Sequence, residues 1–267
     1  METLSLLLGT VLLRPYVFIF LGIFLAIAII DMGLIRSLTF SSLAFGIAFL
    51  SEYSSTRNGF PYGLYTYIEK TRDQELWISN VPFMDPLSFS FLMYISFTLS
   101  LLLWSKLKKK GWDIQLVENN QIRRSWAVIL TGATLFMLMD IIIDPVAFRG
   151  ERWFLGKIYT YEEEGEYFNI PMSNFGGWFL VGIIILYSYT RIELRLTSLM
   201  GPGPFNVPAK ALFGPALYFS VLAFNLVITF YIGEFVLGIY GVLLFSFLFF
   251  LAVFKIIRES ANFRTEV

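Results

Sequence analysis

Long apolar stretches dominate the chain, and short polar segments separate them. A helix needs about 20 mostly apolar residues to cross the hydrocarbon core of a bilayer. Seven stretches approach or reach this length: residues 15–31, 33–51, 86–105, 126–144, 175–190, 211–233 and 235–254. Pro15 should open the first, because proline suits the first helical position, and residues 4–13 form either an interfacial turn or an extension of that helix. The pattern predicts an all-α polytopic membrane bundle of about seven transmembrane helices, folded as a single domain over residues 1–267.

Composition agrees with this fold class and removes several kinds of chemistry. Hydrophobic residues make up 57% of the chain and charged residues 15%, which is typical of a multi-span membrane protein. The net charge is zero, so we expect no nucleic-acid partner. Cysteine and histidine are both absent, which excludes disulfides, histidine-box iron sites, histidine-ligated haem and Ser-His-Asp hydrolysis. The start METLSLLLGT lacks a basic region, so we expect no cleavable signal peptide.

The distribution of lysine and arginine predicts the orientation. Residues 106–124 carry six of them, and segments on that side of the predicted bundle carry thirteen against seven on the other side. Cytoplasmic loops are enriched in these residues, so we expect an N-terminus outside, a cytoplasmic C-terminus and a place in the cell membrane, among its lipids. The two longest loops, residues 52–85 and 145–174, then lie outside, and such loops commonly cap or line a cavity.

Two aspartates interrupt the apolar run MDIIIDPV. Asp140 and Asp144 are four residues apart and share one face of a helix, which we expect to end before Pro145. Glu52 closes the second predicted span and Asp85 opens the third, at the same outer level. Ionisable groups at such positions are functional candidates, and a carboxyl group in apolar surroundings can donate a proton near neutral pH.

The structural alternative is that these acids cap helix ends or form ion pairs. The available cations at this level are Arg57, Arg149 and Arg152. Asn174 and Glu234 also lie near this end of the predicted bundle. A single acid favours the structural alternative, whereas two on one face with two more at the same depth favour a site.

Aromatic residues framed by glycine and proline fill two stretches, GFPYGLYTY at 59–67 and YFNIPMSNFGGW at 167–178. An interfacial aromatic belt explains scattered rings, but the framing indicates a fixed loop shape. Because aromatic faces stabilise cations, acids beside them suit a reaction through a carbocation. The candidate substrate-binding residues are Tyr62, Tyr65, Tyr67, Trp153, Asn174 and Trp178.

The order of several blocks resembles that of a known family. Glu52 is followed by GFPYGLYTY, NVPFMDPL, DIIIDPVAFRGERW and YFNIPMSNFGGW, and over residues 45–190 this is similar to the CruF-type carotenoid hydratases, which are integral membrane proteins. The resemblance implies addition of water across the terminal 1,2 double bond of an acyclic ψ-end of a carotenoid, without metal or cofactor. Family substrates are γ-carotene-like and acyclic C50 precursors. Asn169, where glycine is expected, and the acidic segment 157–166 depart from the pattern and bear on which carotenoid is used.

The residues can be assigned roles in such a reaction. Asp140 or Asp144 would protonate the double bond, and Glu52 or Asp85 would orient the water and take its proton. Tyr62, Tyr65 and Trp178 would surround the cation, while Asn174 would hold water or an acid. A carotenoid would enter laterally from the membrane and water from the outer face. Other enzymes of the carotenoid pathway are candidate partners.

Three other functions remain as alternatives, and a fourth is excluded. A carotenoid end-group cyclase would use the same acid and cation but exclude water. A UbiA-like Mg²⁺-dependent prenyltransferase would need Asp-rich motifs, of which Asp140 and Asp144 supply only half of one. A lipid-binding or structural membrane subunit would not need acids clustered at one depth. A retinal photoreceptor is excluded, because residues 235–254 contain no lysine.

Overall fold

Long apolar helices form the body of the protein. The computed structural model describes residues 2–117, 119–201 and 205–265, with side chains over residues 3–259 of these ranges. Within this part of the chain, seven helices are long and apolar enough to cross a membrane. They are α2 (Pro15–Met32), α3 (Leu34–Asn58), α4 (Met84–Trp104), α6 (Trp126–Phe148), α7 (Met172–Met200), α8 (Phe213–Tyr231) and α9 (Phe235–Thr265). The prediction of an all-α polytopic bundle is confirmed.

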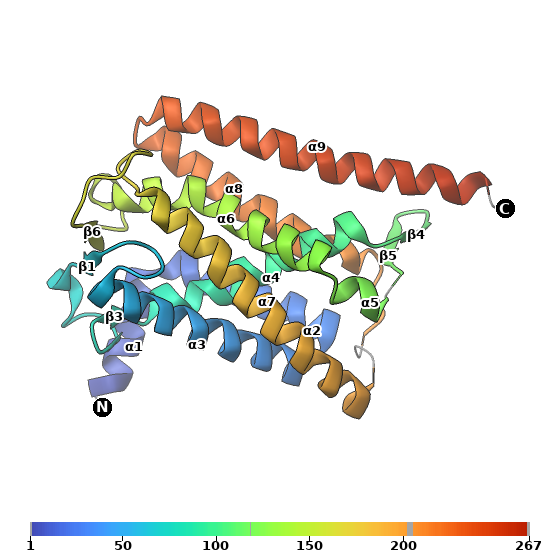
Figure 1. The fold of residues 1–267 in the computed structure, drawn as a ribbon, viewed down its shortest axis with the longest axis horizontal. Coiled ribbons are helices and arrows are strands. Elements are labelled where there is room, and N and C mark those ends of the chain that lie inside the picture. Colours follow the sequence, from blue (N-terminus) through green and yellow to red (C-terminus); the bar gives the residue numbers. More distant parts are fainter. Residues whose placement is uncertain (1, 118, 202–204, 266–267) are drawn as a thin grey trace.

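Helix α4 lies at the centre of the bundle and packs against α2, α3, α6 and α8. Helix α7 covers α6 and α3, and α9 lies along the outside of α8 (Figure 1). Small residues allow the close approach of the central helices. A Cβ on Gly132 of α6 would lie 2.6 Å from Leu186 of α7 and 3.3 Å from the hydroxyl of Ser100 of α4. That hydroxyl donates to the carbonyl of Phe97 and so brings no unpaired donor into the core.

The segment before the first span is a separate helix, α1 (Glu2–Leu13), which runs at a steep angle to the bundle (Figure 1). Residues 4–13 are therefore part of a separate helix, neither a turn nor an extension of α2. Arg14, at the joint between α1 and α2, is buried and pairs with Glu75 of the first long loop at 3.1 Å. It also donates to the carbonyl of Leu155 in the second long loop. One arginine therefore joins the start of the bundle to both loops at this end.

The two long loops pair with each other at one end of the bundle. Strand β1 (Tyr65–Tyr67) is antiparallel to β6 (Tyr159–Tyr161), with Tyr65 opposite Tyr161 and Tyr67 opposite Tyr159. Because side chains alternate along a strand, all four tyrosines lie on one face of this ladder. A second small sheet, β2 (Trp77–Ile78) with β3 (Val81–Pro82), and the 3₁₀ turns η1 (Glu69–Thr71) and η2 (Gly150–Arg152) complete this end.

The opposite end carries the basic segment. Strands β4 (Leu107–Lys110) and β5 (Asp113–Leu116) form a hairpin, followed by the short helix α5 (Asn120–Arg123). The turn η3 (Lys210–Leu212) packs beside β5. Figure 1 places this hairpin at the end of the bundle away from β1 and β6. The basic and acidic segments are thus on opposite sides of the helices, while the orientation of the two ends in a membrane stays a prediction.

Two predicted helix boundaries were wrong. Helix α6 does not end before Pro145 but continues to Phe148. Pro145 lacks the N–H of one helical hydrogen bond. The turn that follows it is held instead by the indole N–H of Trp153, which donates to the carbonyl of Val146 at 3.0 Å. Helix α3 continues past residue 51 to a C-cap at Gly59 with φ of 78°, so Glu52 lies inside the helix rather than at its end.

Candidate functional site

A cavity of about 120 Å³ lies at the end of the bundle that carries the tyrosine ladder. Helices α2, α3, α4, α6, α7 and α8 contribute to its wall, together with both long loops. Nine of the ten predicted site residues line it: Glu52, Tyr62, Tyr65, Tyr67, Asp85, Asp144, Trp153, Asn174 and Trp178. The tenth, Asp140, is fully buried behind the wall. The structure therefore brings nine of the ten predicted residues to one cavity and separates the two aspartates.

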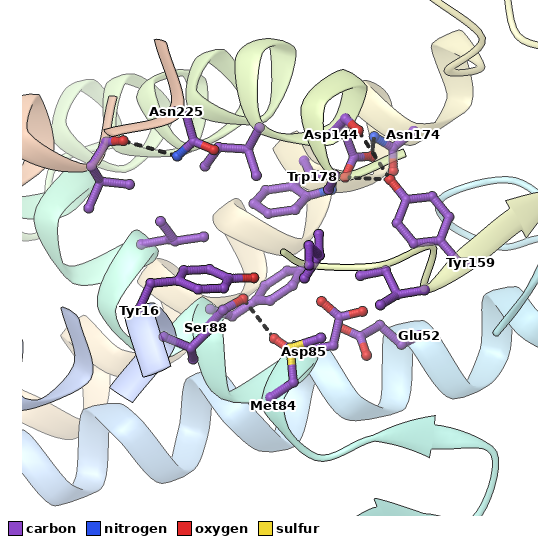
Figure 2. A pocket seen from close by; sticks show the side chains of 18 of the residues that line it. Tyr16, Glu52, Met84, Asp85, Ser88, Asp144, Tyr159, Asn174, Trp178 and Asn225 are labelled. Atoms are coloured by element: carbon purple, nitrogen blue, oxygen red, sulfur yellow. Dashed lines mark hydrogen bonds between the residues drawn. The ribbon is translucent and has the colours of Figure 1, made fainter. Parts of the chain in front are cut away.

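One side of the cavity holds the aspartate pair of α6. The amide nitrogen of Asn174 donates to Asp140 at 2.7 Å and to Asp144 at 2.6 Å, so its two hydrogens are both used. The hydroxyl of Tyr159 donates to the other carboxyl oxygen of Asp144 at 3.1 Å, and that of Tyr161 approaches Asp144 at 3.4 Å. Figure 2 shows Asp144, Asn174 and Tyr159 converging. Asp144 is thus held by three donors and faces the cavity, whereas Oδ1 of Asp140 has no hydrogen-bond partner among the described residues.

The other side holds a second carboxylate pair, from α3 and α4. The hydroxyl of Tyr67 lies 3.0 Å from Glu52 and 2.6 Å from Asp85. A phenol has a single hydrogen, so Tyr67 donates to one carboxylate at a time. Its oxygen lies 3.4 Å from the hydroxyl of Tyr65, which can donate to it. In Figure 2, Glu52 and Asp85 lie close together, away from Asp144.

The tyrosines of the ladder are protonated donors to both pairs. Burial raises the pKa of Tyr65 and Tyr67 well above its ordinary value, and the neighbouring Glu52 and Asp85 raise it further. Burial and then Asp144 do the same to the pKa of the two tyrosines of β6. These hydroxyls therefore keep their hydrogens throughout the neutral range.

Aromatic rings form the floor between the two pairs. Trp178 stacks on Phe89 with ring centroids 4.6 Å apart and lies 4.5 Å from Phe136. The helical repeat explains the placement, because Trp178 follows Asn174 by four residues and Phe136 precedes Asp140 by four. The same helix faces thus present the polar groups and, one turn deeper, the rings.

The ion pairs that the structural alternative requires do not form. Arg149 and Arg152 both pair with Glu234, the former at 3.1 Å, and this interaction draws Glu234 away from the cavity. Arg57 donates to Asn80 at 2.9 Å instead. Within the described ranges, no lysine or arginine lies within ion-pair distance of the four carboxylates. The structural alternative of ion pairing therefore does not account for them.

Several lining residues were missed by sequence reasoning. They are Tyr16 and Phe20 of α2, Ser88 of α4, Tyr159 and Tyr161 of β6, and Phe224 and Asn225 of α8. A signal existed for two of these: the tripeptide YTY occurs at both 65–67 and 159–161. Asn225 was a lone amide within an apolar span, which is itself a mark of function in a membrane helix. The α2 residues carried no signal, because this span is apolar all round and its sequence does not mark which side faces the core.

The cavity continues to the seam between α2 and α8. Tyr16 stacks on Phe224 with ring centroids 5.6 Å apart, and Phe20 meets the same ring edge-on at 5.6 Å. All three side chains are partly exposed on the side of the bundle. Figure 2 shows Tyr16 and Asn225 on this side, away from the carboxylates. The seam is an apolar boundary between the cavity and the surroundings of the bundle.

The fold and site define an integral membrane protein with a cavity lined by acids and aromatic rings. The sequence matches the family described as carotenoid biosynthesis protein over residues 3–248, so the chain belongs to that family. No curated protein and no solved structure matches the chain. Membership agrees with the resemblance seen in the sequence blocks. It gives the protein a role in carotenoid biosynthesis and a carotenoid as its substrate.

Proposed function

We propose that the protein is a carotenoid hydratase that adds water across the terminal 1,2 double bond of an acyclic ψ-end. The observation that carries this proposal is a small cavity with unpaired carboxylates on two sides and an aromatic floor between them. Acid-catalysed hydration of an alkene needs these parts: a proton donor, a surface that stabilises a cation, and a group that takes a proton from water.

The acid in this proposal is Asp144. It lines the cavity, whereas Asp140 is buried behind it and acts as a positioning residue through the amide of Asn174. The π electrons of the double bond form a bond from C2 to the carboxyl proton, which leaves Asp144 as a carboxylate and C1 as a tertiary cation. Asn174 and Tyr159 already donate to Asp144, so the charge that develops there meets donors that need no rearrangement.

The rings of Trp178 and Phe89 line the cavity and face the position of this cation, and Phe136 packs behind Trp178. Each aromatic face stabilises a desolvated cation by about 1–2 kcal/mol. Water then forms the C1–O bond, and its proton goes to Glu52 or Asp85, which share the hydroxyl of Tyr67. The product is a tertiary alcohol.

Turnover requires that one proton return to Asp144. Each cycle removes a proton from Asp144 and leaves one at the Glu52–Asp85 pair. The tyrosine ladder contacts both pairs, through Tyr67 on one side and Tyr161 on the other. These hydroxyls, together with water that enters with the next substrate, would carry the proton back to Asp144.

Cavity size limits which part of the substrate is enclosed. A cavity of 150 Å³ binds benzene, so the space of about 120 Å³ suits the end group of a polyene and not its length. The rest of the chain must lie outside the cavity. The polyene would leave the cavity between α2 and α8, along the seam lined by Tyr16, Phe20 and Phe224.

An end-group cyclase is the second candidate, because it shares the acid and the cation. It would have to keep water from the cation until the ring closed. The Glu52–Asp85 pair and Tyr67 are polar groups on the opposite wall that can hold and deprotonate water. Their presence favours hydration.

The test is expression in a host that produces lycopene, followed by mass analysis of the pigments. The proposal predicts a mass gain of one or two waters. Unchanged mass with altered absorption and retention would indicate cyclisation. A host that makes γ-carotene and one that makes an acyclic C50 precursor extend the test to other end groups, and no hydrated product in any of the three would refute it.

A further inference from the structure

A second cavity, of about 280 Å³, lies at the opposite end of the bundle, between the α2–α3 turn, α5 and the last turns of α7. Its wall is polar and basic and includes Arg36, Arg123 and Arg124, with Asn120 beside them. Two acids, Asp31 and Glu193, complete the charged lining. These residues take no part in the proposed reaction, and Figure 1 places α5 far from the tyrosine ladder.

The two acids of this cavity are already engaged. Glu193 accepts two hydrogen bonds from Arg123, at 2.7 and 2.8 Å, and a third from Tyr189 at 3.1 Å. Asp31 accepts from the hydroxyl of Tyr94 at 3.1 Å. Among the described residues, no group of three acidic side chains converges as metal ligands. The acids therefore give this cavity little capacity to bind a cation.

The arginines, in contrast, have donors left over. Arg36 is 5% exposed and donates to the carbonyls of Met32 and Gly201, but its Nε has no hydrogen-bond partner in the described part of the chain. Arg124 uses its Nε on the carbonyl of Asn120 at 3.0 Å, and its side chain is one of those that line the cavity. A buried guanidinium N–H without an acceptor is costly, so an acceptor is expected in the cavity.

The charge of the lining specifies the acceptor. Three arginines against two acids leave a net charge of +1. The fork of N–H donors on a guanidinium matches the oxygens of a phosphate group. We propose that this cavity binds a phosphate group, carried either by an anionic phospholipid at the membrane surface or by a free phosphate ion.

The neighbouring hairpin fits the lipid source. Its tip carries Lys109, Lys110 and Trp112, and the indole of Trp112 is 96% exposed. Tryptophan and lysine at a membrane boundary anchor to headgroups. The hairpin would then be anchored at the membrane surface, where lipid headgroups are within reach of the cavity.

The test measures binding by the purified full-length protein and does not depend on activity. Native mass spectrometry and thermal melting would be recorded with phosphatidylglycerol, with a digalactosyl diacylglycerol of the same acyl chains, and with inorganic phosphate. We expect phosphatidylglycerol or phosphate to be retained and to raise the melting temperature, and the galactolipid, which lacks phosphate, to do neither. Retention of phosphatidylglycerol alone identifies a lipid headgroup, and stabilisation by inorganic phosphate identifies the free ion.

Arg124→Gln should weaken this binding about tenfold, because a charge-assisted hydrogen bond is lost. Arg36→Gln should do the same, and if it fails to fold because it also holds two carbonyls, Arg124→Gln still decides. Arg195→Gln removes the same charge from an exposed position of α7 that does not line the cavity, and is the matched control. Equal binding of all three probes, no effect of Arg124→Gln, or an equal loss in Arg195→Gln would overturn the proposal.

Discussion

The two ends of the bundle treat buried carboxylates in opposite ways. At one end, Glu193 is matched by Arg123 through two short hydrogen bonds, which is how a protein ordinarily compensates a buried charge. At the other, Asp144 and Glu52 have hydroxyl and amide donors, and no cation of the described side chains lies within ion-pair distance of them. A carboxyl group left without a counter-ion in an apolar interior costs free energy. This cost is the reason why we propose the end with the tyrosine ladder as the site of the reaction.

The largest expected effect is on the acid itself. Asp144→Asn keeps the shape and the contact with Asn174 but removes the proton, so turnover should fall about 10³-fold, in the range of general acid catalysis. Pigment analysis in the carotenoid-producing host measures this. Asp140→Asn should cost less, because Asp140 does not line the cavity. Glu234→Gln, an acid paired with arginines outside the cavity, is the control and should keep activity. Equal activity of Asp144→Asn and the wild type would remove Asp144 from the mechanism.

The paired end should respond in stability. Glu193→Gln leaves Arg123 buried without its partner and should destabilise the protein by about 3 kcal/mol. Melting of the detergent-purified protein would show a drop of several degrees. Asp144→Asn should melt no lower than the wild type, because it removes a carboxyl group that no cation compensates. Equal changes of the melting temperature in the two variants would contradict the proposed difference between the two ends.

Replacing the water-side carboxylate should change the product as well as the rate. Glu52→Gln removes a group that takes the proton from water, and we expect about 10²-fold less hydrated product. The cation formed by Asp144 would then lose a proton or close a ring instead. Chromatography of the pigments should show an increased share of products without added water. A uniform loss of all products would place Glu52 in structure rather than in the water step.

The aromatic floor should contribute less. Trp178→Leu removes one ring face and should reduce turnover about tenfold, equivalent to 1.4 kcal/mol and within the range of a cation–π contact. Trp178→Phe should recover part of this. Trp126→Leu provides the matched control, since Trp126 stacks on Tyr187 at 5.6 Å on the surface of the same pair of helices. Equal effects of Trp126→Leu and Trp178→Leu would indicate packing alone.

The smallest effect is expected from the bridging tyrosine. Tyr67→Phe removes one hydrogen bond, which Glu52 and Asp85 share, with a net contribution of about 1 kcal/mol, so turnover should fall about fivefold. Burial raises the pKa of Tyr67, and a group with a raised pKa keeps its proton at every pH below it. The variant should therefore keep the wild-type pH profile up to about pH 10, the ordinary range for tyrosine. A wild-type alkaline limb below that pH which disappears in Tyr67→Phe would contradict this assignment.

Much of this architecture followed from the sequence, and the failures have physical causes. Apolar runs located the spans, because the length of a membrane helix is set by the bilayer. The separation of Asp140 from the cavity could not be predicted, since residues four apart share a face but differ in depth. Pro145 predicted that α6 would end before it, but the helix continues to Phe148, and Trp153, from outside the helix, binds its last turn. The β1–β6 ladder depends on pairing between segments about 90 residues apart, which no local pattern encodes.

The central claim is that the cavity protonates a terminal double bond and then admits water. Membranes containing the protein and its carotenoid substrate would be incubated in deuterium oxide enriched in oxygen-18, and the product analysed by mass. Our account predicts one deuterium on C2 and one oxygen-18 on C1 for each modified end, with neither in Asp144→Asn. Deuterium without oxygen-18 would contradict it and establish cyclisation by the same acid.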